Sequence, residues 1–145
     1  MIKKLRHVGI VVGDFDRAVK RFEGFGLPLG EELEKKEEGM RIGFFPIGDT
    51  LIEFLQFSPD KGWDPVHKVV RTQEGALNHL CFEVDDLEES IKAFEKNGAK
   101  LLEGSPMKGA HGRVAFFDPS TTENLLVEIC EVQPGRTERA CPKLE

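Results

Sequence analysis

The sequence predicts an α+β fold in which two βαβββ modules share one sheet. Three observations predict it: an internal repeat, strand-like alternation of apolar residues, and a helical spacing of apolar residues after each strand-like run. The segment from Leu5 to Gly26 aligns without a gap with Leu77 to Gly98, at a constant offset of 72 residues, and eight of the 22 aligned positions are identical. A repeat of this kind indicates two copies of one supersecondary unit.

Each copy begins with a predicted strand. In HVGIVV, residues 7–12, large apolar residues alternate with a set that includes His7, and in HLCFEV, residues 79–84, they alternate with a set that includes His79. A period of two is typical of strands. We therefore expect one apolar face that packs on a helix and an opposite face that carries the histidine.

A helix is predicted after each strand. Asp14 and Asp86 stand where N-caps are expected, and Asp86 with Glu89 fits the Asp-x-x-Glu variant of the capping box. Apolar residues then recur at positions i, i+3, i+4 and i+7 in both copies, which predicts one largely apolar side. The glycines expected to follow the helix ends are Gly26 and Gly98.

The repeat continues into the later strands. The aligned pairs are RIGFF at 41–45 with RVAFF at 113–117, and LIEFL at 51–55 with LVEIC at 126–130. The second pair has an offset of 75 because its turn is three residues longer, and this offset superposes Glu53 on Glu128. Each copy is therefore predicted to be strand, helix and three further strands.

The predicted domain organisation follows from the two copies. Residues 1–132 are expected to form a single domain made of repeats 5–57 and 77–132. Residues 58–76 have no counterpart in the repeat and are predicted to be a linker loop with one helical turn around 66–70. Residues 133–145 are polar and are predicted to be a C-terminal tail.

Composition and charge narrow the function classes. The chain has 145 residues, of which 39% are hydrophobic and 32% charged, as in soluble globular proteins. A net charge of -6 argues against a general nucleic-acid or anionic-membrane binder and favours small-molecule partners. Three cysteines without CxxC spacing indicate reduced thiols. The start of the chain does not read as a signal peptide and no apolar run is long enough for a membrane span, so we expect a cytoplasmic location.

Four polar residues lie inside predicted strands, on the face opposite the helices: His7, Glu53, His79 and Glu128. A carboxylate in mid-strand without a partner costs on the order of several kcal/mol in desolvation. One strand histidine alone would usually be a packed core residue, but here both residue types occur twice in the same register. Two imidazoles and two carboxylates predict one divalent metal, with cobalt, zinc, nickel, manganese or iron favoured over calcium. The sheet is thus expected to curve around a metal, with open positions for a substrate oxygen.

These strands and residues resemble the vicinal oxygen chelate superfamily, which includes glyoxalase I, methylmalonyl-CoA epimerases, extradiol dioxygenases and the fosfomycin and bleomycin resistance proteins. The resemblance covers residues 5–132 and implies the glyoxalase-like fold, in which two βαβββ modules wrap around one metal. A His/Glu/His/Glu ligand set resembles glyoxalase I and the epimerases in particular. The family also makes a homodimer the expected assembly.

Within the superfamily, the chain is most similar to the methylmalonyl-CoA epimerases. The motifs that carry the similarity are HVGI at 7–10, EEGM at 37–40, NHLCFEVD at 78–85 and GAHG at 109–112. The resemblance implies a metal-dependent epimerase in which Glu128 and Glu37 move a proton on opposite faces of the carbon next to a thioester carbonyl. By itself, the charged run around Glu37 would indicate only a solvated surface. His111 is expected either to close over the substrate in a mobile loop or to be exposed.

Other functions remain open on the sequence alone. The runner-up is a glyoxalase I-type lyase that acts on a hemithioacetal, and a third candidate is a non-catalytic protein that binds a small molecule. An iron dioxygenase is disfavoured because the fourth carboxylate leaves less room for both substrate and O₂. If the substrate is an acyl thioester of coenzyme A, Lys108 or Lys61 could contact the carrier's phosphates.

Overall fold

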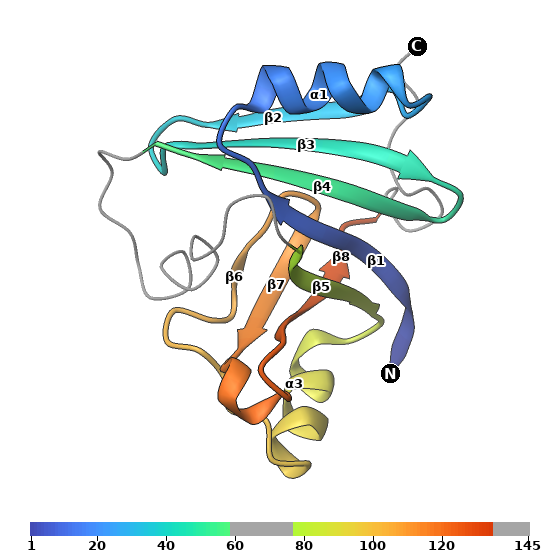
Figure 1. Ribbon diagram of the computed structural model, residues 1–145. Coiled ribbons are helices and arrows are strands. Elements are labelled where there is room, and N and C mark those ends of the chain that lie inside the picture. The colour runs from blue at the N-terminus through green and yellow to red at the C-terminus, as the bar shows by residue number, and fades with distance from the viewer. Residues whose placement is uncertain (59–76, 135–145) are drawn as a thin grey trace.

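A computed structural model describes residues 1–58 and 77–134 of the chain (Figure 1). The predicted linker loop from 59 onward and nearly all of the predicted tail lie outside these residues. The first module contains β1 (Ile2–Val11), α1 (Phe15–Gly24), β2 (Glu31–Lys35), β3 (Met40–Ile47) and β4 (Thr50–Phe57). The second contains β5 (Leu77–Val84), α3 (Leu87–Lys96), β6 (Met107–Lys108), β7 (Gly112–Phe117), the 3₁₀ turn η1 (Pro119–Thr121) and β8 (Leu126–Val132).

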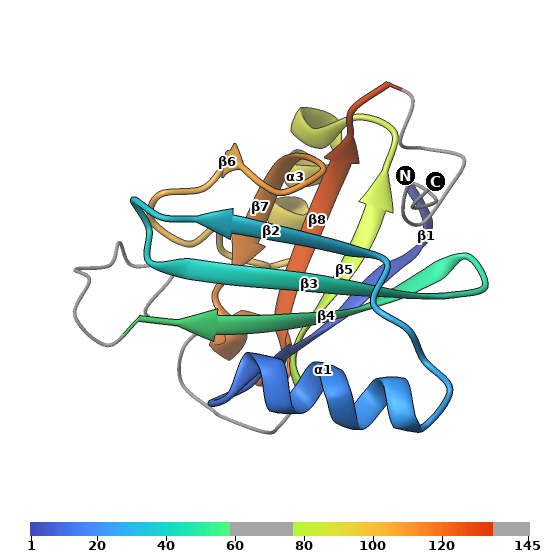
Figure 2. The same ribbon diagram turned by 90° about the horizontal axis from the view of Figure 1, so that it is seen from above.

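The eight strands of the described residues form one sheet in the order β2-β3-β4-β1-β5-β8-β7-β6. Within each module the first strand pairs in parallel with the last, β1 with β4 and β5 with β8, and the modules join through the antiparallel pair β1 and β5. The order is thus the same when it is read outward from the centre in either direction. Figure 2 shows β2, β3 and β4 crossing over β5, β7 and β8, so the sheet is strongly curled. The predicted α+β fold of two βαβββ modules is confirmed.

The predicted helix caps are present. The carboxylate of Asp14 accepts a hydrogen bond of 3.0 Å from the amide of Arg17, and that of Asp86 accepts one of 2.8 Å from the amide of Glu89. These bonds satisfy amides that have no partner within the first helical turn. Gly26 and Gly98 follow the helix ends with φ angles of 91° and 93°, a left-handed conformation that glycine adopts without steric cost.

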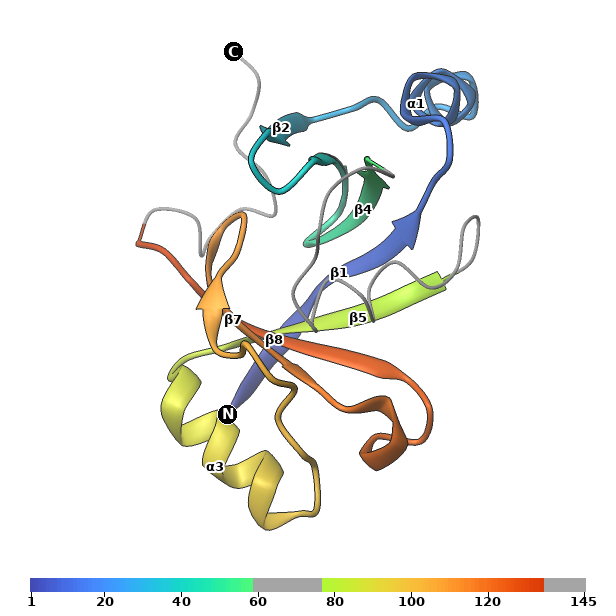
Figure 3. The same cartoon turned by 90° about the vertical axis from the view of Figure 1, so that its left-hand side faces the viewer.

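The helices cover the outer face of the sheet, as Figures 1 and 3 show. Under α1, Phe15 packs with Phe45 and Phe54, and under α3, Leu87 packs with Phe117 and Ile129. A third apolar cluster lies on the inner, concave face and contains Val11, Met40, Ile42, Phe44, Leu51, Leu55, Cys81, Val114, Phe116, Leu126, Cys130 and Val132. Among the described residues, neither helix is long and apolar enough to cross a membrane.

Candidate metal centre

The four predicted ligands lie on four adjacent strands in the middle of the sheet. His7 is on β1, Glu53 on β4, His79 on β5 and Glu128 on β8. Gly9 is the register partner of both Glu53 and His79, so these two side chains face each other across β1. Strand alternation then places all four on the concave face, where each is nearly fully buried.

The ligating atoms of these four residues converge on one point. His7 Nε2 lies 3.0 Å from His79 Nε2, and each of these nitrogens lies 3.1 Å from Glu128 Oε2. Glu53 Oε1 lies 3.3 Å from His79 Nε2 and 3.6 Å from His7 Nε2. His7, His79 and Glu128 form a group whose ligand atoms lie close enough together to hold one metal ion. Glu53 stands next to this group, with its carboxylate against both histidines.

The hydrogen atoms of the two histidine rings are too few to make a hydrogen bond in each of these contacts. A ring nitrogen presents either one hydrogen or one lone pair, yet each Nε2 here has the other histidine and two carboxylates within 3.6 Å. A cation at the centre would receive a lone pair from every atom. Metal–ligand bonds of about 2.1 Å separate adjacent donors by about 3.0 Å in an octahedral site and about 3.4 Å in a tetrahedral one, which matches the observed distances. The four residues therefore fit a divalent transition metal.

His79 is held in the orientation that metal binding needs. Its Nδ1 lies 2.9 Å from Asn78 Oδ1, and because this oxygen can only accept, Nδ1 donates and Nε2 faces the centre. The ring rests against the backbone of β1 at Gly9, where an added Cβ would lie 2.0 Å from His79 Cε1. Gly9 is therefore required by the position of the ring.

Charge and burial shift two pKa values at the centre in the absence of metal. Burial alone would lower the pKa of His79, but its hydrogen bonds to Glu128 and Glu53 outweigh burial and raise the pKa to about 10. Burial alone would raise the pKa of Glu128, but the charges and hydrogen bonds of His7 and His79 outweigh burial and lower the pKa to about 2. Without metal, both shifts favour the charged forms of His79 and Glu128, an imidazolium beside a carboxylate.

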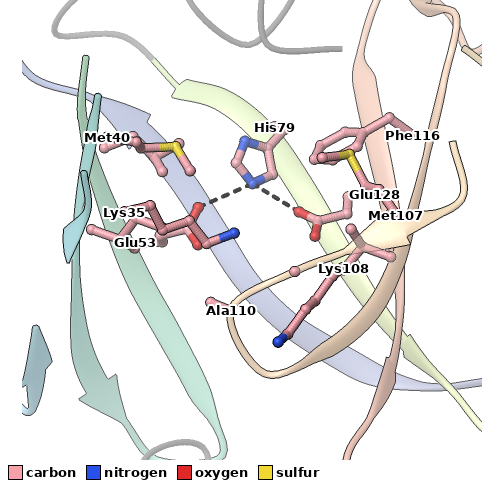
Figure 4. Close-up of a pocket in the computed structure, with 13 residues that line it drawn as sticks. Lys35, Met40, Glu53, His79, Met107, Lys108, Ala110, Phe116 and Glu128 are labelled. Atoms are coloured by element: carbon pink, nitrogen blue, oxygen red, sulfur yellow. Dashed lines mark ion pairs between the residues drawn. The ribbon is translucent and has the colours of Figure 1, made fainter. Parts of the chain in front are cut away.

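A pocket opens beside the centre (Figure 4). Its polar residues are Glu53, His79 and Glu128 at the base, with Lys35 and Lys108 on opposite walls. The rest of the lining consists of Met40, Ile42, Leu55, Met107, Gly109, Ala110, Val114 and Phe116. A small, mostly apolar cavity with a few convergent polar groups is the usual form of a small-molecule site. The sequence indicated Lys108 as a possible contact for the phosphates of a carrier. It gave no such indication for Lys35, which lies in a run of charged residues.

Glu37, His111, Cys81 and Cys130 do not line the pocket, although Cys81 is the register partner of both His7 and Glu128. Glu37 lies exposed in the turn 36–39 between β2 and β3 and does not line the pocket, so its catalytic role stays a prediction. His111 is 4% exposed and hydrogen-bonded on both ring nitrogens, so the alternative of an exposed side chain is wrong. Cys81 and Cys130 are buried free thiols that do not line the pocket, and burial raises the pKa of Cys81 well above its usual value.

Comparison with known proteins gives a family match over most of the chain. The profile of the Glyoxalase/Bleomycin resistance protein/Dioxygenase superfamily matches residues 6–117. The ethylmalonyl-CoA/methylmalonyl-CoA epimerase of Cereibacter sphaeroides is 30% identical over 91% of this chain and 100% of its own length. The mitochondrial methylmalonyl-CoA epimerase of Dictyostelium discoideum is 29% identical over 90% of this chain and 79% of its own length.

Solved structures share the fold. A hypothetical protein of Bacillus halodurans is 29% identical and superposes with a TM-score of 0.77, covering 90% of this chain and 94% of its own. A variant of the methylmalonyl-CoA epimerase of Streptomyces coelicolor, in complex with 2-nitronate-propionyl-CoA, is 20% identical, with a TM-score of 0.78 and coverage of 92% and 97%. At that lower identity the likeness shows the shared fold.

Proposed function

The chain belongs to the Glyoxalase/Bleomycin resistance protein/Dioxygenase superfamily, and we propose that it is a divalent-metal-dependent epimerase. The reaction is a proton transfer at the carbon next to the carbonyl of an acyl thioester, with a methylmalonyl-CoA-type substrate. One observation carries the proposal: four ligand atoms converge beside a pocket, and three of the ligands, Glu53, His79 and Glu128, line the base of that pocket. The names of the curated relatives support the choice of an isomerase.

We propose that His7, Glu53, His79 and Glu128 hold the metal. The mixed nitrogen and oxygen donors suit cobalt, zinc, nickel or manganese. When bound, such an ion supplies Lewis acidity that stabilises the negative charge developing on the substrate oxygens as the proton leaves. Asn78 fixes the tautomer of His79 that this role requires.

Glu128 is suited to accept the proton. Its carboxylate lines the pocket where the acyl group would lie. In the proposed reaction Glu128 takes the proton from one face of the carbon, and Glu37 returns a proton to the other. The turn that carries Glu37 begins directly after Lys35, a pocket residue.

The walls of the pocket suit an anionic acyl thioester. Lys35 and Lys108 point into it from opposite modules, and their ammonium groups would attract a carboxylate or the phosphates of coenzyme A. The apolar side chains between them, such as Met40 and Met107, would contact the alkyl branch. Methionine adapts to irregular shapes, which favours small branched acyl groups of differing size.

Deuterium incorporation tests the function. The protein, reloaded with cobalt or zinc, is incubated in D₂O with 2-methylmalonyl-CoA, and deuterium at the carbon next to the carbonyl is measured by NMR. We expect wash-in that Glu128→Gln slows by about 10²–10⁴-fold, while metal content, checked by elemental analysis, is measured in parallel. Glu131→Gln is the matched control because Glu131, on the same strand, accepts a hydrogen bond from the amide of Leu87 and does not line the pocket.

The same experiment separates the competing functions. No exchange with any acyl thioester would rule out the epimerase. Loss of methylglyoxal in the presence of a thiol would instead identify a glyoxalase-type lyase. The homodimer and the cytoplasmic location expected from the sequence stay predictions, and light scattering after gel filtration tests the first of them.

A further inference from the structure

A second buried polar network lies next to the pocket and contains none of the four ligands. Arg6 Nη1 donates to Glu83 Oε2 at 3.4 Å, and Arg6 Nη2 lies 3.2 Å from His111 Nδ1. His111 Nε2 lies 3.1 Å from Glu31 Oε2. The side chains of Arg6, Glu83 and His111 are at most 3% exposed, and that of Glu31 is 13% exposed. We call these four residues the His111 clamp.

The His111 clamp joins the two modules at the ends of the sheet. Glu31 lies on β2, which is one edge strand, and His111 lies in the connection between β6 and β7, at the other edge. His111 and Glu31 are in contact although β2 and β6 are the first and last strands of the sheet order. The contact between Glu31 and His111 therefore closes the curled sheet across the concave face.

The hydrogen positions in the clamp follow from the donor inventory. A guanidinium only donates, so His111 Nδ1 must accept from Arg6. Nε2 then carries the hydrogen of the neutral ring and donates it to Glu31. His111 consequently needs an acceptor oxygen at position 31 but does not need a negative charge there.

The loop that carries His111 also forms part of the pocket wall. Gly109 and Ala110 line the pocket together with Met107 and Lys108. The loop is tight, because Gly109 N donates to Gly112 O at 2.7 Å and an added Cβ at Gly112 would lie 2.1 Å from the carbonyl oxygen of Glu131. The backbone of this loop is therefore held against β8, within the second module. The side chain of His111 makes the contact between the loop and the first module.

The ring of His111 is anchored by packing as well. It lies on Phe44 with ring centroids 4.4 Å apart, and Phe44 in turn contacts His7 with centroids 6.0 Å apart. Phe44 therefore packs both against the pocket wall, through His111, and against strand β1, through His7. A ring held by two hydrogen bonds and a closely packed aromatic ring has little rotational freedom.

We propose that His111 is a positioning residue that clamps the pocket wall of residues 107–110 against the first module and thereby sets the affinity for the acyl group. The identity of the substrate rests on the proposed function, whereas the clamp itself does not. Among the described residues, the side-chain hydrogen bonds of His111 go to Arg6 and Glu31 and to none of the four ligands, so metal stoichiometry is expected to stay unchanged when it is replaced.

The test combines hydrogen exchange with kinetics on the metal-loaded protein. In His111→Ala we expect the amides of residues 107–112 to exchange about 10- to 100-fold faster, as for loss of two buried hydrogen bonds, and KM for 2-methylmalonyl-CoA to rise by a similar factor, with kcat changed much less. Glu31→Gln supplies the acceptor oxygen and should behave as the wild type, whereas Glu31→Ala removes one of the two hydrogen bonds and should raise both quantities by about tenfold.

Leu87→Ala is the control for a loss of stability alone, because Leu87 is buried under α3 on the outer face. It should lower the unfolding temperature and leave both KM and the exchange of residues 107–112 unchanged. Wild-type exchange and KM in His111→Ala, or equal effects of Gln and Ala at position 31, would overturn the clamp. If the wild type turns over no acyl thioester, the proposed function fails, and hydrogen exchange alone then decides the clamp.

Discussion

Replacing Gly9 by alanine should disable the metal centre without touching a ligand. The added Cβ would lie 2.0 Å from Cε1, 2.4 Å from Nδ1 and 2.6 Å from Nε2 of His79. Ordinary contacts of a Cβ begin at 3.4 Å, so the ring must move by about 1.4 Å. A metal–ligand distance tolerates only about 0.2 Å, so His79 would leave its place in the ligand set.

The expected effect is large on metal binding and moderate on folding. We expect Gly9→Ala to weaken Co²⁺ or Zn²⁺ binding by about 100-fold or more, since even residues that only orient a ligand contribute 10- to 100-fold. Overpacking of this kind costs about 1–3 kcal/mol in the free energy of unfolding of the metal-free protein. Calorimetric metal titration measures the first quantity and denaturant unfolding the second.

Two further variants make the result specific. Gly24→Ala adds the same methyl group where no atom lies within 4 Å, so it should leave metal affinity unchanged. In a His79→Ala background the ring is absent, and Gly9→Ala should then cost little stability. Wild-type metal affinity in Gly9→Ala, or an equal cost in both backgrounds, would refute the assignment of Gly9 as the support of the His79 ring.

Three other predictions concern charge and packing. The pKa of His79 is raised from 6.5 to about 10 without metal, so the charged ring stabilises the folded metal-free protein fully below about pH 6.5, and this stabilisation is lost as the pH rises toward 10. The unfolding temperature of the metal-free protein should therefore fall between pH 6.5 and 10. An unfolding temperature that does not change over this range would contradict the pairing of His79 with the carboxylates. Metal binding at pH 7 should release about one proton from His79, measured by titration in buffers of different ionisation enthalpy, and no release would show that the ring is neutral. Leu87→Ala should cost about 2–5 kcal/mol in unfolding free energy because it empties a fully buried site, and a cost below about 1 kcal/mol would contradict the packing under α3.

Much of the fold and of the candidate centre could be predicted from the sequence because the governing patterns are local and occur twice. Alternation in HVGIVV and HLCFEV fixed the faces of β1 and β5, and the aspartate before each helix fixed where the helix begins. The repeat supplied the long-range step, since equivalent strands of two equal modules meet at the centre of the sheet. It thereby predicted that His7 and His79 approach, and their Nε2 atoms lie 3.0 Å apart.

The position of Arg6 shows where alternation fails. A strict period of two would place Arg6 on the outer face, opposite to His7. The register with β5 shifts between Leu5 and His7, and Arg6 meets Glu83, which shares the inner face with His79. A bulge of this kind inserts one residue and turns the side chain, and no motif in the sequence marks it.

By itself, the sequence determined two βαβββ modules, the faces of their strands and the four residues that gather between them, because periodicity and repetition encode these features within short segments. Only the tertiary structure decided that Lys35 faces the pocket, that Glu37 lies exposed in a turn, and that His111 is buried against Arg6 and Glu31. The contacts of His111 with Glu31 and Arg6 join residues that are 80 and 105 positions apart in the chain. They depend on how far the sheet curls, which is set by packing of the whole inner face and by no local pattern.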